Sequence, residues 1–367
     1  TSVNTGTLQA GSDNALGQTS KLNLADTTTF DLNGKTQTLG ALNGAMGSTL
    51  NVNSGTLNLS NGGTSAGALT GAGQLNVNGG TLDVQGANSG LSAATAIANG
   101  ATVNINNIDG LGSSEITTAG TLRMTGATGT LDNVINGVGS VQLSNAADVT
   151  LAGINTLSGR WDTATGTRLT ATEAANLGTA VVNNTGTFNV DTATDWTLDN
   201  AINGTGAVTK NGTGTLTIAR ANSYSGPTTI SGGVLKLTNA DGAGTGVVNV
   251  DAAADLELAL TTASVFDNQL AGAGTTTVSG SQATITADNS AYTGNWNVTD
   301  LGTLAVADSA TSSTTNLGSG NVNIAAGGTV NAQTTGAFSF DNVLTGAGTL
   351  NASNNGQAFN FGSGVGA

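Results

Sequence analysis

Short runs of alternating apolar and polar residues recur along the whole chain. Five of them lie near the start: LNVN at 50–53, GTLNLS at 55–60, QLNVN at 74–78, GTLDV at 80–84 and TVNIN at 102–106. Alternation with a period of two indicates β-strands with one face inward and one face outward. Strands this short, between Gly and Asn corners, cannot bury a face alone, but stacked coils share a continuous core of Val, Leu and Ile. The pattern therefore predicts an all-β fold, a β-solenoid.

The distance between similar runs predicts the length of one turn. GTLNL begins at 55 and GTLDV at 80, so we expect these two runs to stack on each other, and the chain to hold roughly 16 rungs. A β-propeller is the all-β alternative. Its blades usually carry aromatic signatures, and only 3% of this chain is aromatic, which disfavours it.

Longer repeats overlie the short runs. Five degenerate copies of a strand, a polar excursion, a glycine and another strand begin near residues 6, 90, 166, 232 and 302. A second box falls between them in the same order, as LDNVINGVGSV at 131, LDNAINGTGAV at 198, FDNQLAGAGTT at 266 and FDNVLTGAGTL at 340, with a shortened form at 39. Because the order is kept five times, we predict that residues 1–367 form a single continuous solenoid segment.

The repeat also predicts which residues of a strand face the core. In GGVLKL at 232–237, Val234 and Leu235 are adjacent, so at most one of them points inward in a regular strand. Matching this copy to Leu304 and Val306 of the next one places Leu235 and Leu237 in the core.

Composition changes the picture in three ways. Charged residues are 8% and there is one proline, whereas disordered chains are usually rich in both, so an ordered fold is favoured. No apolar stretch is long enough for a membrane-spanning helix, and the N-terminus lacks the features of a signal peptide, so we expect a mature or excised segment. The absence of cysteine excludes disulfides and Cys-based metal sites, and suits a chain that crosses an envelope unfolded.

Residues 211–237, NGTGTLTIARANSYSGPTTISGGVLKL, resemble the passenger-associated transport repeat of Gram-negative autotransporters. The surrounding boxes are similar to the passengers of AIDA-type, antigen 43-like self-associating adhesins. The resemblance implies a right-handed parallel β-helix at the cell surface, anchored at the outer membrane through a C-terminal translocator barrel. The end of this sequence, NNGQAFNFGSGVGA, lacks the strand pattern of such a barrel.

The resemblance also implies a function in adhesion, autoaggregation, biofilm formation and virulence. The leading partner is then an identical passenger on a neighbouring cell. Two alternatives stay open: heterotypic adhesion to host matrix proteins or glycans, and a passive β-helical stalk that carries a separate tip. The sequence does not separate these three.

We expect no enzymatic activity, no cofactor and no metal. A Ser-His-Asp triad needs histidine, and the chain has none. The chain has 22 acidic residues, so their number alone does not exclude cleavage of polysaccharides by paired carboxylates. The eight basic residues that could assist such cleavage are scattered along the sequence. Gly-x-Gly runs such as 137–139 and 204–206 are followed by no helical period, so they predict tight corners and no dinucleotide site. Tandem calcium nonapeptides do not occur, and a net charge of −14 disfavours nucleic acid.

Two tryptophans are candidate partner-binding residues. Trp161 and Trp296 stand at matching places in two corner copies, shortly after Gly159 and Gly294. They are interpreted either as an aromatic platform for a sugar or partner, or as caps packed over the edge of a rung.

Four aspartates are the other candidates. The segments NVDTATDWTL at 189–198 and NVDAAADLEL at 249–258 align without gaps. If Val190, Trp196 and Leu198 face inward, Asp191, Asp195 and Asp199 face outward, and the second copy exposes Asp251, Asp255 and Glu257. The separation of the two copies predicts about three rungs between them and a spacing of roughly 15 Å. Such a ridge either keeps the surface soluble and blocks sideways sheet growth or binds a partner.

Overall fold

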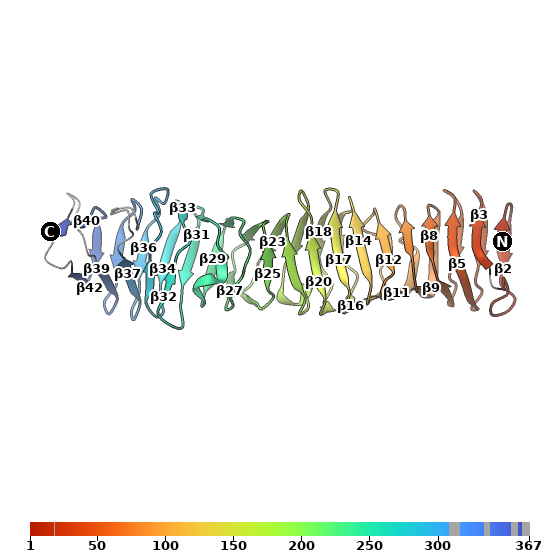
Figure 1. Ribbon diagram of the computed structural model, residues 1–367, viewed down its shortest axis with the longest axis horizontal. Coiled ribbons are helices and arrows are strands. Elements are labelled where there is room, and N and C mark those ends of the chain that lie inside the picture. Colours follow the sequence, from red (N-terminus) through yellow and green to blue (C-terminus); the bar gives the residue numbers. More distant parts are fainter. Residues whose placement is uncertain (18, 308–315, 334–337, 354–358, 362–367) are drawn as a thin grey trace. The chain divides into compact units, whose positions relative to one another are not determined.

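The chain folds into stacked turns of parallel β-strands. The computed structural model describes residues 1–17, 19–307, 316–333, 338–353 and 359–361. It is an all-β parallel solenoid of about 17 turns, which confirms the predicted fold class (Figure 1). Among the described residues there is no α-helix, only the short 3₁₀ helices η1 (Ala174–Asn176) and η2 (Ala240–Ala243), and therefore no helix that could cross a membrane.

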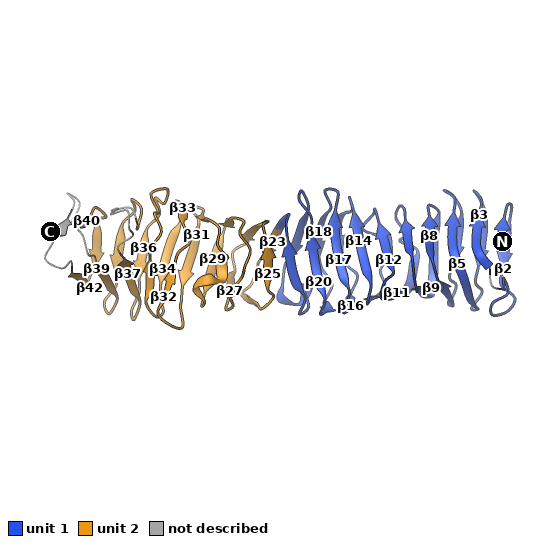
Figure 2. Ribbon diagram, viewed as in Figure 1, with its two compact units in different colours: residues 1–187 blue, residues 188–367 orange. Residues whose placement is uncertain are grey.

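The chain divides into two compact units, residues 1–187 and 188–367 (Figure 2). The strands that begin in the first unit are β1 (Ser2–Val3), β2 (Thr7–Gln9), β3 (Thr19–Leu24), β4 (Thr29–Asp31), β5 (Thr36–Gly44), β6 (Thr49–Asn51), β7 (Gly55–Leu59), β8 (Gly62–Ser65), β9 (Ala68–Val77), β10 (Thr81–Val84), β11 (Leu91–Ile97), β12 (Thr102–Ile105), β13 (Ile116–Thr118), β14 (Thr121–Thr125), β15 (Thr128–Leu131), β16 (Ile135–Gly137), β17 (Ser140–Ser144), β18 (Asp148–Leu151), β19 (Thr156–Leu157), β20 (Arg160–Thr163), β21 (Arg168–Ala171), β22 (Val181–Asn184) and β23 (Thr187–Asp191).

The strands of the second unit continue the numbering. They are β24 (Trp196–Leu198), β25 (Ile202–Gly204), β26 (Ala207–Asn211), β27 (Thr215–Ile218), β28 (Thr228–Ile230), β29 (Gly233–Leu237), β30 (Val248–Val250), β31 (Ala254–Leu258), β32 (Ser264–Phe266), β33 (Leu270–Gly272), β34 (Thr275–Val278), β35 (Ala283–Ile285), β36 (Trp296–Val298), β37 (Thr303–Ala307), β38 (Val322–Ile324), β39 (Thr329–Gln333), β40 (Phe338–Phe340), β41 (Leu344–Gly346), β42 (Thr349–Ser353) and β43 (Phe359–Phe361).

One turn is shorter than the repeated runs suggested. Thr81 of β10 pairs with Gly62 of β8 on one side and with Thr102 of β12 on the other, so one turn ends and the next begins at Thr81. The expected stacking of GTLDV on GTLNL is therefore wrong, because β10 stacks on β8, whereas β7 pairs with β9. The sequence of β8, GGTS, carries no alternating large apolar residues, and the period-two pattern could not reveal it.

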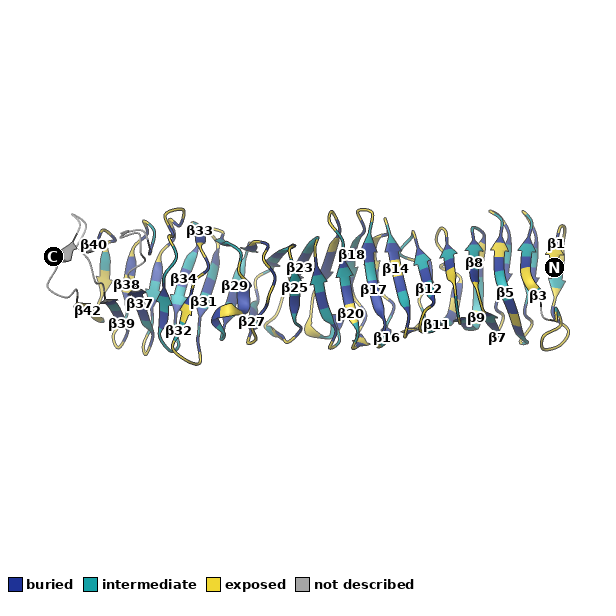
Figure 3. Cartoon of the chain, viewed as in Figure 1, coloured by how far each residue is buried: buried dark blue, intermediate teal, exposed yellow. Residues whose placement is uncertain are grey.

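The core is a set of apolar columns that run from turn to turn. In one of them Leu216, Leu235 and Leu256 lie in register on β27, β29 and β31, and each is at most 1% exposed. Leu237 is equally buried, whereas Val234 is only half-buried. The register predicted for this strand is thus confirmed, and the alternation of buried and exposed positions recurs along the strands (Figure 3).

Buried asparagines at corners of the solenoid replace a backbone hydrogen-bond partner. Asn222 accepts a hydrogen bond from the N–H of Ile202 at 2.9 Å and donates to the C=O of Gly242 at 2.8 Å, so it bridges three successive turns. Asn155 and Asn289 do the same in their own turns. Corner backbone cannot join the strand ladder, and a buried unpaired N–H or C=O is costly. The asparagine therefore stabilises each corner from inside.

Candidate functional site

The predicted acidic positions lie mostly at the surface of the second unit. Asp191, Asp195 and Asp251 are exposed and Asp255 is half-buried. Val190 and Leu198 are buried as predicted, while Trp196 is only half-buried. The outward orientation expected for these carboxylates is confirmed, with Asp255 the least accessible of the four.

Asp195 and Asp255 share one column but do not form a continuous ridge. Trp196 pairs with Leu216, and Thr215 pairs with Val234, which pairs with Asp255. Three rungs separate the two carboxylates, about 14 Å at the usual strand spacing, as the alignment predicted. Thr215 and Val234 occupy the two positions between them in the column. The surface between the two carboxylates is therefore partly polar and partly apolar, and it carries no charge in this column.

Asp255 is a half-buried carboxylate whose pKa is raised. Burial raises its pKa, the hydroxyl of Thr277 donates to both of its oxygens at 3.1 Å and lowers the pKa, and the charge of Glu257 raises it again. Glu257 is held by Lys236, with 3.0 Å between Nζ and Oε1, and by the Ser279 hydroxyl at 2.5 Å. The carboxylates of Asp255 and Glu257 thus already have hydrogen-bond and ion-pair partners within the chain.

The two candidate tryptophans are inside the core. Both are 0% exposed, and their indole N–H groups donate to the C=O of Leu177 at 3.1 Å for Trp161 and of Leu317 at 2.9 Å for Trp296. The prediction of a surface aromatic platform is corrected on this point. Each tryptophan takes an inward position of its strand, as Trp161 does between Val141 and Val182, so neither can touch a partner in the folded chain.

Lys210 is a buried cation that the sequence analysis missed. It is 1% exposed, and its ammonium donates to the C=O groups of Asn211 at 3.0 Å, Gly212 at 3.0 Å and Gly232 at 2.9 Å. Burial lowers its pKa, and the nearby charges of Asp191 and Asp195 raise it. The signal available in the sequence was a lysine at an inward position of the alternating run in β26.

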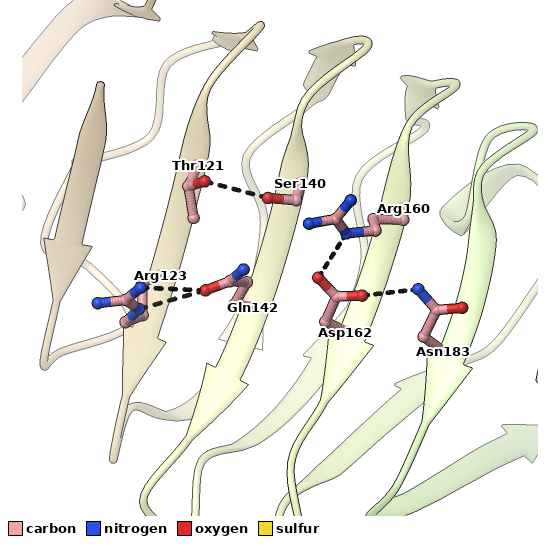
Figure 4. A network of polar contacts seen from close by, with 7 residues as sticks. All are labelled: Thr121, Arg123, Ser140, Gln142, Arg160, Asp162 and Asn183. Atoms are coloured by element: carbon pink, nitrogen blue, oxygen red, sulfur yellow. Dashed lines mark hydrogen bonds and ion pairs between the residues drawn. The ribbon is translucent and has the colours of Figure 1, made fainter. Parts of the chain in front are cut away.

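A polar face covers the outward side of six strands that stack on one another in the first unit, β10, β12, β14, β17, β20 and β22. We call it the Arg123 face, and its in-register column consists of Asp83, Asn104, Arg123, Gln142, Asp162 and Asn183. Arg123 donates through Nε and Nη2 to the Gln142 side-chain carbonyl at 3.3 and 3.2 Å. Arg160 and Asn183 both donate to Asp162, at 2.7 and 2.9 Å (Figure 4).

A groove of about 660 Å³ lies beside this face. We call it the Arg160 groove; its lining comes from five successive turns and consists of Asn99, Gly100, Ala101, Thr102, Ala119, Gly120, Thr121, Val138, Gly139, Ser140, Gly159, Arg160, Val181 and Asn183. Its corners differ in length, because 98–101 turn the chain before β12, whereas 138–139 suffice before β17.

Glycine is required at the corners that line the hollow. A Cβ on Gly159 would lie 1.8 Å from the carbonyl oxygen of Gly139, and a Cβ on Gly139 would lie 2.4 Å from that of Gly120. Only residues without a side chain allow the turns to approach this closely. The predicted role of the Gly-x-Gly run at 137–139 as a corner is confirmed, and the groove follows from its alignment with the neighbouring corners.

In the part of the chain that the structure describes, no three His, Cys, Asp or Glu side chains lie close enough together to hold an ion.

Comparison with known proteins supports an autotransporter passenger. Residues 208–237, which run from β26 to the end of β29, match the passenger-associated-transport-repeat family. The chain is 40% identical over 186 residues to the uncharacterized lipoprotein YdeK of Escherichia coli (strain K12), covering 50% of this chain and 14% of that protein. It is 48% identical over 122 residues to the uncharacterized protein YuaQ of the same strain, covering 33% of this chain and 9% of that protein. The chain thus spans only a small part of both relatives, and no solved structure matches.

Proposed function

We propose that this segment belongs to the passenger of a surface adhesin of the AIDA-type, antigen 43-like group. Its leading activity is self-association between identical passengers on neighbouring cells, leading to autoaggregation and biofilm formation. The observation that carries the proposal is the transport repeat at 208–237 within a solenoid whose outward faces bear ladders of uncharged polar side chains.

These ladders provide many similar contact points. Asn76 donates to the Asn58 side chain at 2.8 Å, and Asn43 donates to the Asn23 side chain at 3.2 Å. A bond of this kind holds each amide in a fixed orientation, while an asparagine side chain has two donor hydrogens and two acceptor lone pairs. A second passenger can therefore add hydrogen bonds to a preorganised row. Each contributes only about 0.5–1.5 kcal/mol, so strength comes from their number and from display on the cell.

Location follows from the same proposal. The passenger is exposed at the cell surface and held at the outer membrane by a translocator barrel in the full-length protein. The name of the first relative, a lipoprotein, offers a lipid anchor as another means of attachment. The segment itself acts as a binding surface and not as an enzyme.

Sedimentation velocity of the purified segment at rising concentration tests self-association. We expect the weight-average sedimentation coefficient to increase with concentration, because identical polar faces meet in pairs. A species that stays monomeric at every concentration favours the two other hypotheses, a passive stalk or heterotypic adhesion to host matrix proteins or glycans.

A further inference from the structure

The Arg160 groove contains one charged side chain among its lining residues, and that side chain is held in position. Asp162 Oδ2 accepts from Nε of Arg160 at 2.7 Å, and its other oxygen accepts from Asn183 at 2.9 Å. Asp162 is thus engaged at both oxygens, and it binds the guanidinium by its inner nitrogen. Figure 4 shows the guanidinium on the Ser140 side of its own strand.

The two terminal nitrogens of Arg160 are left open to a ligand. The side chain is 53% exposed, and among the described residues Nη1 and Nη2 make no hydrogen bond. A guanidinium presents these two nitrogens as a rigid planar fork that matches a carboxylate, and such paired charge-assisted bonds are strong and directional. Asp162 acts as a positioning residue, because it fixes the plane of the fork.

The rest of the groove suits a sugar chain. The hydroxyls of Thr121 and Ser140 lie 3.1 Å apart on adjacent turns, and the amide of Asn99 also lines the groove; groups of these kinds can bond sugar hydroxyls. The glycine corners bring backbone close to the surface, so a flat ring can approach. Five turns span about 19 Å at the usual strand spacing, which accommodates several sugar units.

We propose that the Arg160 groove binds a linear polysaccharide that carries carboxylates, a uronic acid polymer. The fork favours this class because it binds one carboxylate, and the net charge of −14 repels densely sulfated chains more strongly than the less charged uronate polymers. The binding is independent of the proposed self-association, because it needs no second passenger. Uronates occur in animal matrix polymers and in bacterial exopolysaccharides, and both present the same carboxylate to the groove.

Titration calorimetry with the full chain tests the proposal. The probes are hyaluronan oligosaccharides, in which uronates alternate with amino sugars, oligoguluronate, in which every unit is a uronate, and a carboxyl-reduced form of each. We expect the unreduced oligosaccharides to bind and the reduced ones to bind at least tenfold more weakly. Stronger binding of hyaluronan indicates the matrix source, and stronger binding of oligoguluronate indicates the bacterial source.

Arg168 provides a matched control. It is also 53% exposed and also paired with an aspartate, Asp148, at 3.2 Å, but it lies on β21, outside the groove. Arg160→Met and Arg168→Met each remove one positive charge, so they change the net charge equally. We expect Arg160→Met to raise Kd roughly ten- to hundredfold and Arg168→Met to leave it within about twofold, with both variants melting as the wild type does.

Two further variants separate positioning from charge. Asp162→Asn keeps the size of the side chain but weakens its hydrogen bond with Nε of Arg160. We therefore expect a smaller loss of affinity than Arg160→Met causes. Arg160→Lys keeps the charge without the fork and should also bind more weakly than the wild type.

Thr121→Trp fills the groove and should abolish binding without changing the charge. The proposal is overturned if no uronate binds, if the reduced forms bind equally well, if Thr121→Trp binds normally, or if Arg160→Met and Arg168→Met lose affinity equally.

Discussion

At the scale of the residue, stability depends on single inward positions of short strands. Leu235 lies in register between Leu216 of the preceding turn and Leu256 of the following turn, so an inward side chain belongs to two turn interfaces. In a stacked repeat such nearest-neighbour interfaces supply most of the stability. A charge at an inward position is thus expected to open a local segment of several turns.

Leu235→Asp tests this register. A buried, unpaired carboxylate costs several kcal/mol, so we expect a lower melting temperature and new protease cleavage near β29. Lys236→Asp, one position away and outward, serves as the control; it replaces the ion pair with Glu257 by a repulsion between two carboxylates that water can screen. Wild-type melting of Leu235→Asp together with a destabilised Lys236→Asp would contradict the register.

Lys210→Met tests the buried ammonium. Its removal leaves the carbonyls of Gly212 and Gly232 without that donor, and each unsatisfied buried group costs about 1–3 kcal/mol. We therefore expect chemical denaturation to give a lower free energy of unfolding. The in-register neighbours Ile230 and Val250 show that an apolar side chain fits the site, so a folded variant is expected.

The pH dependence of the same variant has a defined sign. Because the folded-state pKa of Lys210 lies below its usual value of 10.5, the unfolded chain binds more protons in the window just below that value. Stability of the wild type relative to Lys210→Met should then rise with pH through that window. A relative stability that falls there would mean that the ammonium is not desolvated.

At the scale of the element, the corners carry more information than the strands. Asn222 links β25 to the corner that follows β29 through two backbone bonds, and its counterparts recur in the long repeats. The strands between them use interchangeable Val, Leu and Ile. Corner asparagines such as Asn222 are therefore harder to replace than the apolar residues of the strands.

Asn222→Ala tests the corner. It leaves the N–H of Ile202 and the C=O of Gly242 unpaired, so we expect a loss of about 2–5 kcal/mol in unfolding free energy. Asn323→Ala is the control, because Asn323 is exposed and, among the described residues, its side chain bonds only the Thr345 hydroxyl at 3.2 Å. A similar loss in both variants would show that burial of the asparagine is not what matters.

At the scale of the whole molecule, net charge opposes self-association. Two copies at −14 each repel, but repulsion between exposed charges is screened beyond about 8 Å at physiological ionic strength, and short hydrogen bonds are screened less. Moderate salt should strengthen association or leave it unchanged. Mild acid near pH 4 should strengthen it further, as aspartates approach their reference pKa of about 3.9.

Replacing Asp191, Asp195, Asp251 and Asp255 with Asn tests where the repulsion acts. If these positions lie at the contact, the variant should associate at neutral pH as the wild type does in acid, as measured by sedimentation. Association that is strongest at low salt and lost in the Asn variant would instead indicate salt bridges. The exposed basic residues, beginning with Arg160 and Arg168, would then be the partners to map, and not Lys210, which is buried.

Catalytic inactivity is the remaining prediction for the whole molecule. Incubation with casein and with acidic and neutral polysaccharides should release no new chain ends, because the chain has no histidine and its Asp255–Glu257 pair is occupied by Thr277, Lys236 and Ser279. A cleavage activity that disappears on replacing Asp195 or Asp255 would refute a purely adhesive role.

The sequence by itself determined the solenoid, the inward register at Leu235 and the corner role of glycine. Each of these depends on residues that are close in the sequence. The alternation of apolar and polar residues follows from strand geometry. Corners with a positive φ or with closely approaching backbone favour glycine. The transport repeat was equally local, since residues 208–237 form consecutive strands.

Only the tertiary structure decided the length of a turn, the burial of Trp161 and Trp296, and the Arg160 groove. These depend on which residues stack across turns, and β8 shows that a strand of GGTS joins the stack with no pattern to reveal it. A tryptophan after a glycine corner gives the same pattern whether it points in or out, until the neighbouring turn is placed. The groove likewise takes its lining from five successive turns, so it exists only when those turns lie side by side.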